Sequence, residues 1–299
     1  MLANKYYCPI CEENKSVDLI GAYKHRSKMF CNKQLFKCQD CELIFVHPMP
    51  DAAELDWYYK NIWIKDGQSV SLSRETELVY RIQAKERVKY LSRFISLRPD
   101  MKILDIGAGF GYLYNAFDKT DIKADSFYAT DPSPDNLERL KAKGVNAFSS
   151  LAELNQRGFD LVTLCYVLEH INDPYQFMIS VMDYVKDGGY VFIDLPERDD
   201  TFKPVLEPHV AVYTAESLKH LANKLGFKII HLTGYGVKRS DLIAQTSAKR
   251  NLINRFENVF GRIANKIHRR DDVQKLYKQY KFNEEGEGRW WIRAVLRKK

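Results

Sequence analysis

The sequence lacks long apolar runs. None approaches the roughly 18 consecutive apolar residues of a membrane-spanning helix. The first residues, Met1 to Tyr7, also lack the apolar core of a secretory signal. We therefore expect a cytoplasmic protein without a transmembrane segment. At 299 residues, with 45% hydrophobic and 28% charged residues, the chain suits one large domain with appendages, or two domains.

Cysteine is nearly absent after residue 41: five of the six cysteines precede that point, and Cys165 stands alone. A disulfide framework is not expected in a reducing cytoplasm. Four of the cysteines form two C-x₂-C pairs separated by 26 residues, which is typical of a structural zinc ribbon with an extended hairpin or loop between its knuckles: Cys8, Cys11, Cys38 and Cys41. Cys31 and His25 lie outside these pairs. Reduced cysteines without metal are the alternative.

A dinucleotide-binding turn is excluded by a missing glycine. The segment Leu-Asp-Ile-Gly-Ala-Gly-Phe-Gly at 104–111 would need a further glycine where Tyr112 stands. Glycines allow the backbone to pass close to a ligand. Asp105, two residues before the first glycine, fits a pyrophosphate poorly and suits a ligand with a positive ammonium group. The apolar stretch 101–104 predicts a buried strand, so the pattern indicates a nucleotide-type crevice at its carboxyl end.

A second acid follows the next apolar run. Asp131 ends the stretch Phe-Tyr-Ala-Thr-Asp, and Ser133 and Pro134 are placed as N-cap and first helical residue. The combination resembles motif I of class I S-adenosylmethionine-dependent methyltransferases, in which D/E-x-G-x-G-x-G cradles the methionine end and the second acid binds the ribose hydroxyls. The resemblance implies these cofactor contacts: Asp105, Gly107, Ala108, Gly109, Gly111, Asp131, Pro132, Ser149, Cys165, Tyr166 and Tyr59.

The remaining chain alternates between strand-like and helix-like segments, which predicts an α/β fold with a Rossmann-like doubly wound sheet. The resemblance implies seven strands in the order 3-2-1-4-5-7-6, with residues 289–296 as an antiparallel last strand. We expect a zinc ribbon over 1–50, a helical linker or lid over 51–100 and a methyltransferase domain over 101–299. A helical insertion over about 238–288 would precede the last strand.

An aromatic cluster lies in the expected linker: Trp57, Tyr58, Tyr59 and Trp63. Ordinary core packing would account for it. The alternative is a lid, because aromatic rings exclude water and can lie against a sulfonium cation.

Two further blocks supply candidate catalytic residues. Leu-Glu-His at 168–170 resembles a segment that follows the fourth strand in small-molecule methyltransferases, which implies that Glu169 or His170 lies near the acceptor. A structural role for both is the alternative. His209 lies in an H-x-x-x-(F/Y)-(S/T) block, and the resemblance makes it our candidate general base or substrate-orienting group.

Two nucleic-acid mechanisms lack their motifs. No N/D-P-P-Y/F block follows the fourth expected strand, so amino methylation of bases is not supported. Cys165 follows Leu164 and not a proline, so the cytosine C5 mechanism is not supported either.

Positive charge is concentrated near the C-terminus. Residues 238–299 hold 17 Lys/Arg and 7 Asp/Glu, a balance of +10 within a chain of net charge +7. This favours an acidic partner, namely a phosphate-bearing substrate, nucleic acid or a membrane surface reached through a basic amphipathic helix near 252–270. A solvated basic face is the alternative.

The sequence therefore predicts methyl transfer from S-adenosylmethionine to a small acceptor. The resemblance extends to bacterial enzymes that combine a four-cysteine ribbon with this domain and act on sugars or related small molecules, which implies a hydroxyl of a sugar or glycan-pathway intermediate. An RNA methyltransferase using the ribbon and the basic segment is the alternative. A binding module that holds the cofactor without turnover is a third hypothesis.

Overall fold

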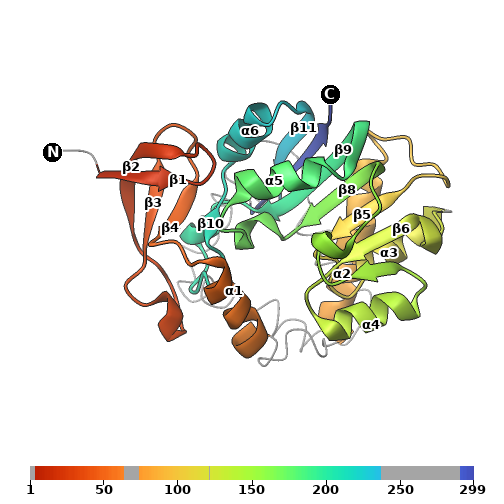
Figure 1. Ribbon diagram of the computed structural model, residues 1–299, viewed down its shortest axis with the longest axis horizontal. Coiled ribbons are helices and arrows are strands. Elements are labelled where there is room, and N and C mark those ends of the chain that lie inside the picture. Colours follow the sequence, from red (N-terminus) through yellow and green to blue (C-terminus); the bar gives the residue numbers. More distant parts are fainter. Residues whose placement is uncertain (1–3, 64–73, 121, 237–289) are drawn as a thin grey trace, which may run out of the picture.

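The computed structural model describes residues 4–63, 74–120, 122–236 and 290–299. The described part contains two β-sheets that lie at opposite ends of the molecule (Figure 1). One has seven strands and is flanked by helices, and the other has five strands and contains the N-terminal segment. The expected insertion over 238–288, with its amphipathic stretch near 252–270, lies outside the described residues.

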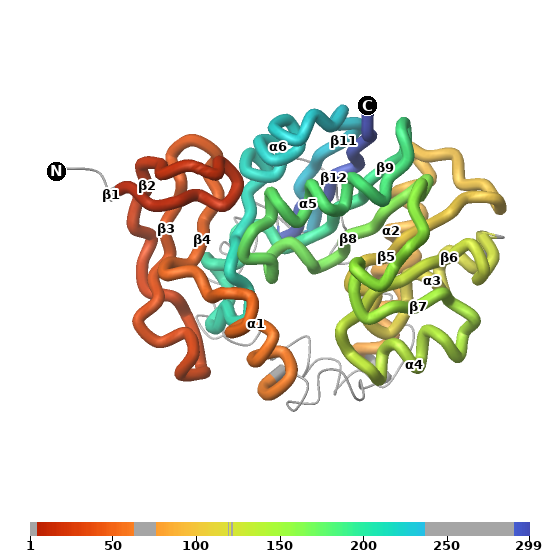
Figure 2. The backbone as a smooth tube through the Cα atoms, in the orientation of Figure 1, coloured from red at the N-terminus to blue at the C-terminus, as the bar shows by residue number. Residues whose placement is uncertain are grey.

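The seven-stranded sheet has the order β11-β12-β9-β8-β5-β6-β7. Its strands are β5 (Ile103–Ile106), β6 (Phe127–Thr130), β7 (Asn146–Phe148), β8 (Phe159–Cys165), β9 (Val185–Pro196), β11 (Lys228–Tyr235) and β12 (Trp291–Arg297). Strands β5 to β9 pair in parallel, whereas β12 is antiparallel to both β9 and β11. Figure 2 shows the C-terminal β12 between these two neighbours. The expected strand order and the expected antiparallel strand are both confirmed.

Helices cover both faces of this sheet because its side chains alternate between two apolar clusters. Leu104 and Val162 belong to one cluster with residues of α5 (Pro174–Met182) and α6 (Ala215–Lys224). Ile103 and Leu161, one position earlier on the same strands, belong to a cluster with residues of α2 (Arg74–Leu91), α3 (Tyr112–Phe117) and α4 (Pro134–Ala142). All four residues of β5 are buried, as expected for a central strand covered on both faces.

The N-terminal sheet is antiparallel and is completed from a distant part of the chain. It contains β1 (Asn4–Cys8), β2 (Glu13–Ala22), β3 (Gln34–Cys38), β4 (Ile44–His47) and β10 (Ala211–Val212). Strand β10 follows β9 of the large sheet, and the Val46 amide donates to the Val210 carbonyl at 3.0 Å. The segment 1–50 therefore shares its sheet with β10 from the second half of the chain.

Helix ends agree with the local sequence at most positions. Thr214 caps α6 by a capping box with Ser217, and Gly226 follows the helix with a φ of 76°. Helix α1 (Ala52–Tyr58) begins with a capping box between Asp51 and Glu54. Ser133 is the N-cap of α4 and Pro134 is its first residue, as expected, although the Ser133 side chain makes no capping bond. None of the described helices combines the length and apolar character needed to cross a membrane.

Candidate functional site

The glycine turn after β5 has a backbone that requires glycine. Gly107, Gly109 and Gly111 have φ values of 71°, 52° and 70°, in the left-handed region that side chains disfavour. The Gly107 and Ala108 amides donate to the Thr130 carbonyl at 2.8 and 3.0 Å, which fixes the turn against the end of β6.

The three glycines differ in what surrounds them. A Cβ added to Gly107 would lie 2.8 Å from Val167 Cγ2, and one added to Gly111 would lie 2.8 Å from Leu140 Cδ2. A Cβ on Gly109 would meet nothing within 4 Å. The outer glycines are therefore needed for packing, whereas Gly109 faces open space.

Asp131 connects the turn to the helix after β6. Its Oδ2 accepts from the Gly109 amide at 2.8 Å, and its Oδ1 accepts from the Ser133 amide and from Asn136 Nδ2 at 3.0 Å each. Three donors hold this buried carboxylate in one orientation at the carboxyl end of β6.

Asp105 is the buried acid at the carboxyl end of β5. Thr163 Oγ1 donates to its Oδ1 at 2.6 Å. Burial raises the pKa of Asp105 to about 7, although Thr163 and Arg87 act in the opposite direction. A ligand with a positive group would stabilise the ionised form.

A cluster of two arginines and one acid lies beside Asp105. Asp194 on β9 is fully buried, and its Oδ2 accepts from Arg87 Nε at 2.8 Å and lies 3.6 Å from Arg293 Nη2. Tyr235 donates its hydroxyl to Asp194 Oδ1 at 2.7 Å. Two guanidinium groups share one carboxylate, so the cluster carries excess positive charge. Among the described residues, Arg87 Nη2 and Arg293 Nε have no hydrogen-bond partner, so these atoms can bind an anion.

Sequence reasoning missed this cluster, although one signal was available. Arg87 stands on the face of α2 that also carries the buried Ala84, Val88 and Leu91. A cation on the apolar face of a helix requires a partner in the core. The identity of that partner, 107 residues away, is not visible in the sequence.

Cys165 and Tyr166 end β8 beside the same cluster. Tyr166 has a φ of 60°, and its ring centre lies 5.1 Å from the Arg87 guanidinium carbon. Burial raises the pKa of the Cys165 thiol, so this cysteine is protonated at neutral pH and is not a thiolate nucleophile.

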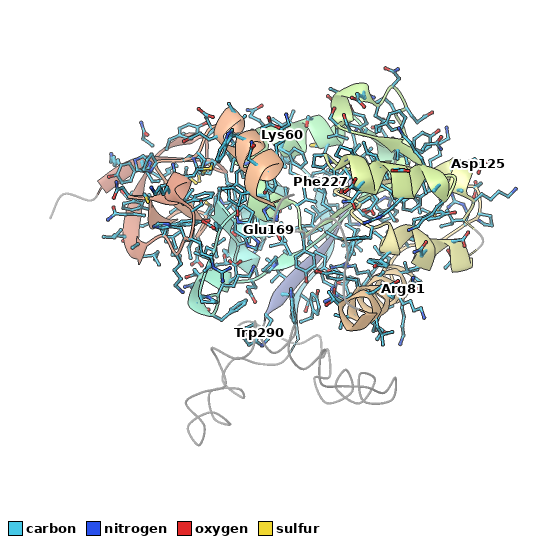
Figure 3. All side chains as sticks on the ribbon, turned by 90° about the horizontal axis from the view of Figure 1, so that it is seen from below. Lys60, Arg81, Asp125, Glu169, Phe227 and Trp290 are labelled. Carbon is cyan, nitrogen blue, oxygen red and sulfur yellow. The ribbon has the colours of Figure 1, made fainter. Side chains whose placement is uncertain are left out.

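The second group of ionisable side chains lies between the two sheets. Glu169 and His170 belong to the short 3₁₀ helix η6 (Leu168–His170), and His209 precedes β10. Each offers one ligand atom, and these atoms lie within 4.8 Å of one another. Figure 3 shows Glu169 near the middle of the molecule. Burial raises the pKa of Glu169 to about 8.

His209 is held by a carboxylate that sequence reasoning did not identify. Its Nδ1 lies 2.5 Å from Asp199 Oδ2, and Lys203 Nζ lies 3.4 Å from both that oxygen and His209 Nε2. Burial alone would raise the pKa of Asp199. The effects of His209 and Lys203 outweigh that of burial and lower this pKa to about 2. Burial and Lys203 lower the pKa of His209, so its imidazole is neutral at pH 7 and can accept a proton.

The aromatic residues of the expected linker lie in different environments. Tyr58 packs edge-on against Phe30 in the core, whereas Trp57 is 54% exposed. Tyr59 begins the π-helix η2 (Tyr59–Trp63), and its ring centre lies 6.0 Å from that of His170. Tyr59 therefore lies beside the Glu169–His170–His209 cluster.

Two other expected cofactor contacts lie near Asp131. Pro132 is exposed directly after it. Ser149 follows β7 and donates its hydroxyl to Glu153 Oε1 at 2.6 Å.

The four paired cysteines converge at one point of the N-terminal sheet. All four are buried, with Sγ atoms of Cys8 and Cys41 3.5 Å apart and those of Cys11 and Cys38 3.9 Å apart. Tetrahedral zinc with Zn–S bonds of about 2.3 Å places its sulfurs about 3.8 Å apart, so the cluster fits that ion. Lys224 on α6 donates to the Cys11 carbonyl at 2.6 Å, which joins the knuckle to the large domain.

Residues 80–232 match a family model described as a methyltransferase domain. This match spans the glycine turn, both acids and the Glu169–His170–His209 cluster, and it covers just over half of the chain. The chain belongs to this methyltransferase family. It is an S-adenosylmethionine-dependent methyltransferase, with a mixed seven-stranded sheet of the Rossmann-like type.

Relatives of known name are distant. The methyltransferase is 27% identical over 189 residues to a ubiquinone biosynthesis O-methyltransferase of Hydrogenovibrio crunogenus, which covers 60% of this chain and 72% of the relative. A protein of the same name from Serratia proteamaculans is 30% identical over 108 residues, covering 33% of this chain and 44% of the relative. The chain therefore matches less than half of this second relative.

Solved structures agree with the fold. An S-adenosylmethionine-dependent methyltransferase from Thermotoga maritima aligns with a TM-score of 0.51 at 14% identity, covering 82% of this chain and 99% of that chain. The plantazolicin methyltransferase BpumL, in complex with a monoazolic desmethylPZN analogue and S-adenosylhomocysteine, aligns with a TM-score of 0.52 at 13% identity, covering 82% of this chain and 93% of that chain.

Proposed function

We propose that this enzyme transfers the methyl group of S-adenosylmethionine to a hydroxyl oxygen of a small acceptor, most specifically a sugar or glycan-pathway intermediate. One observation carries the proposal. The acids and glycines that suit the cofactor end β5 and β6, and a separate buried cluster of Glu169, His170 and His209 follows β8 and β9. The carboxyl ends of parallel strands meet at one edge of a sheet, which supports a crevice shared by donor and acceptor groups.

The cofactor half of the site is assigned by charge. Asp105 would pair with the ammonium group of the methionine part, and Asp131 would accept hydrogen bonds from the ribose hydroxyls. Arg87 and Arg293 carry excess positive charge beside Asp105, which suits the methionine carboxylate. Gly109, which borders open space, would allow the ligand to approach the backbone.

The reaction is an in-line displacement. The bond between the methyl carbon and the sulfonium sulfur breaks while a carbon–oxygen bond forms, and S-adenosylhomocysteine leaves. A hydroxyl acceptor must also lose its proton. His209 is our candidate for the base that receives this proton, or for the group that orients the hydroxyl, since its imidazole is neutral and held by Asp199. His170 and Glu169 complete the acceptor side.

The acceptor class is the finer part of the proposal. Relatives are named O-methyltransferases, which supports oxygen as the methylated atom. The sugar assignment depends on the resemblance to ribbon-containing methyltransferases. The basic balance of residues 238–299 suits a phosphate on the acceptor, such as a nucleoside diphosphate.

The four-cysteine cluster is proposed to hold structural zinc. Four thiolates leave no open coordination position for chemistry. The ion would hold together the strand ends that carry Cys8 and Cys38. Through the bond from Lys224 to the Cys11 carbonyl, it would also set the position of the N-terminal sheet relative to α6.

The test is a labelled methyl-transfer assay. The purified enzyme is incubated with methyl-labelled S-adenosylmethionine and, in separate arms, nucleotide sugars, ubiquinone precursors and RNA. Label in the nucleotide sugars is expected, and label only in RNA would replace the proposal by the RNA alternative. Asp105→Asn should abolish transfer, whereas the matched exposed variant Asp125→Asn should retain it. Uptake of S-adenosylhomocysteine without transfer to any arm would favour the non-catalytic alternative.

A further inference from the structure

The Glu169 carboxylate is buried without compensation. The residue is 2% exposed, and neither carboxylate oxygen has a hydrogen-bond partner among the residues that the structure describes. A buried carboxylate without a partner is costly, so such groups normally pair with a charge, bind a metal or take up a proton. This acid therefore holds a proton at neutral pH, or exchanges that proton for a cation bound at this point.

Two histidines face the same point. The ligand atoms of Glu169, His170 and His209 lie within 4.8 Å of one another. An ion held at about 2.1 Å in tetrahedral or octahedral geometry places neighbouring ligand atoms about 3.0–3.4 Å apart. Side-chain rotations that close the widest separation by about 1.4 Å would bring the three atoms within that range.

Outer partners orient both imidazoles. His209 Nδ1 is bonded to Asp199, which leaves Nε2 as the ligand atom, and His170 has a hydrogen bond with the Pro208 backbone. Metal-binding histidines commonly have such a carboxylate or carbonyl behind them. The Val210 amide donates to the Glu169 carbonyl at 2.8 Å, so the two segments that supply the ligands are fixed to each other.

We propose that Glu169, His170 and His209 bind a divalent transition-metal ion on the acceptor side of the crevice. Two imidazoles and one carboxylate suit ions such as Mn²⁺, Fe²⁺, Co²⁺ or Zn²⁺ and leave coordination positions open. Under the proposed function, two neighbouring oxygens of the acceptor, as in a vicinal diol, would fill those positions. His209 would then be the orienting group of the two roles assigned to it.

Lys203 limits the affinity of this site. Its ammonium group lies 3.4 Å from His209 Nε2, close to the place of the ion, and is also paired with Asp199. A dication must move this side chain aside, and its exposed fraction of 24% leaves room for that movement. Removing the lysine charge should therefore strengthen metal binding.

The probe is Mn²⁺ added to the zinc-loaded, full-length protein, with free Mn²⁺ followed by electron paramagnetic resonance. The thiolate site disfavours this hard ion, so the cysteines do not compete for it. We expect one bound Mn²⁺ per chain. Glu169→Gln and His209→Asn should each lower the affinity at least tenfold, and Asp199→Asn should lower it roughly 10- to 100-fold. Lys203→Met should raise it. The matched variants Glu216→Gln and His231→Asn, outside the cluster, should bind as the wild type does.

The Lys203→Met variant still tests the proposal if the ligand variants fail to fold. A misfolded protein would not bind Mn²⁺ more tightly than the wild type does. Absence of stoichiometric Mn²⁺, or equal binding by all variants, would overturn the metal site. Calorimetry with S-adenosylhomocysteine separates the two proposals. Cofactor uptake without Mn²⁺ binding would overturn only the metal site, and Mn²⁺ binding without cofactor uptake would overturn only the proposed function.

Discussion

Replacing Arg87 by methionine removes one of the two guanidinium groups that meet at Asp194. Methionine keeps much of the length and apolar contact of arginine but removes the charge. Breaking a buried ion pair costs about 3–5 kcal/mol. Here Asp194 keeps the Tyr235 hydroxyl at 2.7 Å and Arg293 at 3.6 Å, so we expect the lower end of that range.

The effect on the cofactor should depend on its amino-acid part. A hydrogen bond to a charged group contributes about 1.5–3 kcal/mol, which corresponds to roughly a 10- to 100-fold weaker Kd. Arg87→Met should therefore weaken binding of S-adenosylhomocysteine by that factor. Binding of 5′-methylthioadenosine, which lacks the carboxylate and the ammonium group, should not change.

Calorimetric titration with both ligands measures this difference, and urea denaturation measures the stability loss. The control is Arg81→Met on the same helix, because Arg81 is exposed and its ion pair among the described residues is with Glu77, one turn away. Equal weakening for both ligands would refute the assignment of Arg87 to the carboxylate and would make its role purely structural.

Three further predictions concern the acid, the imidazole and the glycines. The pKa of Asp105 is about 7, and only its ionised form pairs with an ammonium group. S-adenosylhomocysteine should therefore bind more tightly as the pH rises from about 6 to about 8. Asp105→Asn should remove this pH dependence, as measured by calorimetry. His209→Asn should reduce the methyl-transfer rate by about 10²–10⁴ while leaving cofactor Kd unchanged; an altered Kd with a normal rate would contradict its acceptor-side role. Gly107→Ala should lower the free energy of unfolding by about 1–3 kcal/mol more than Gly109→Ala does, as measured by thermal denaturation. Both glycines have left-handed backbones, but only the Cβ added at position 107 would meet Val167. Equal losses would contradict this packing argument.

The sequence alone determined most of the large sheet. Its strands are apolar runs bounded by glycines, acids and helix caps, and these are local signals. The strand order followed from the resemblance that the glycine turn, Asp105 and Asp131 carried. The four paired cysteines were likewise readable, because metal-ligand spacing is local in each knuckle.

Tertiary structure decided the features that join distant segments. Three contacts depend on how separate elements pack: the ion pair of Arg87 with Asp194, the pairing of β10 with β4, and the contact of Asp199 with His209. The position of Tyr59 beside His170 was likewise not visible in the sequence. Local propensity specifies strands and turns, but burial and charge pairing among remote residues exist only once the chain has packed, and these determine the electrostatics of the site.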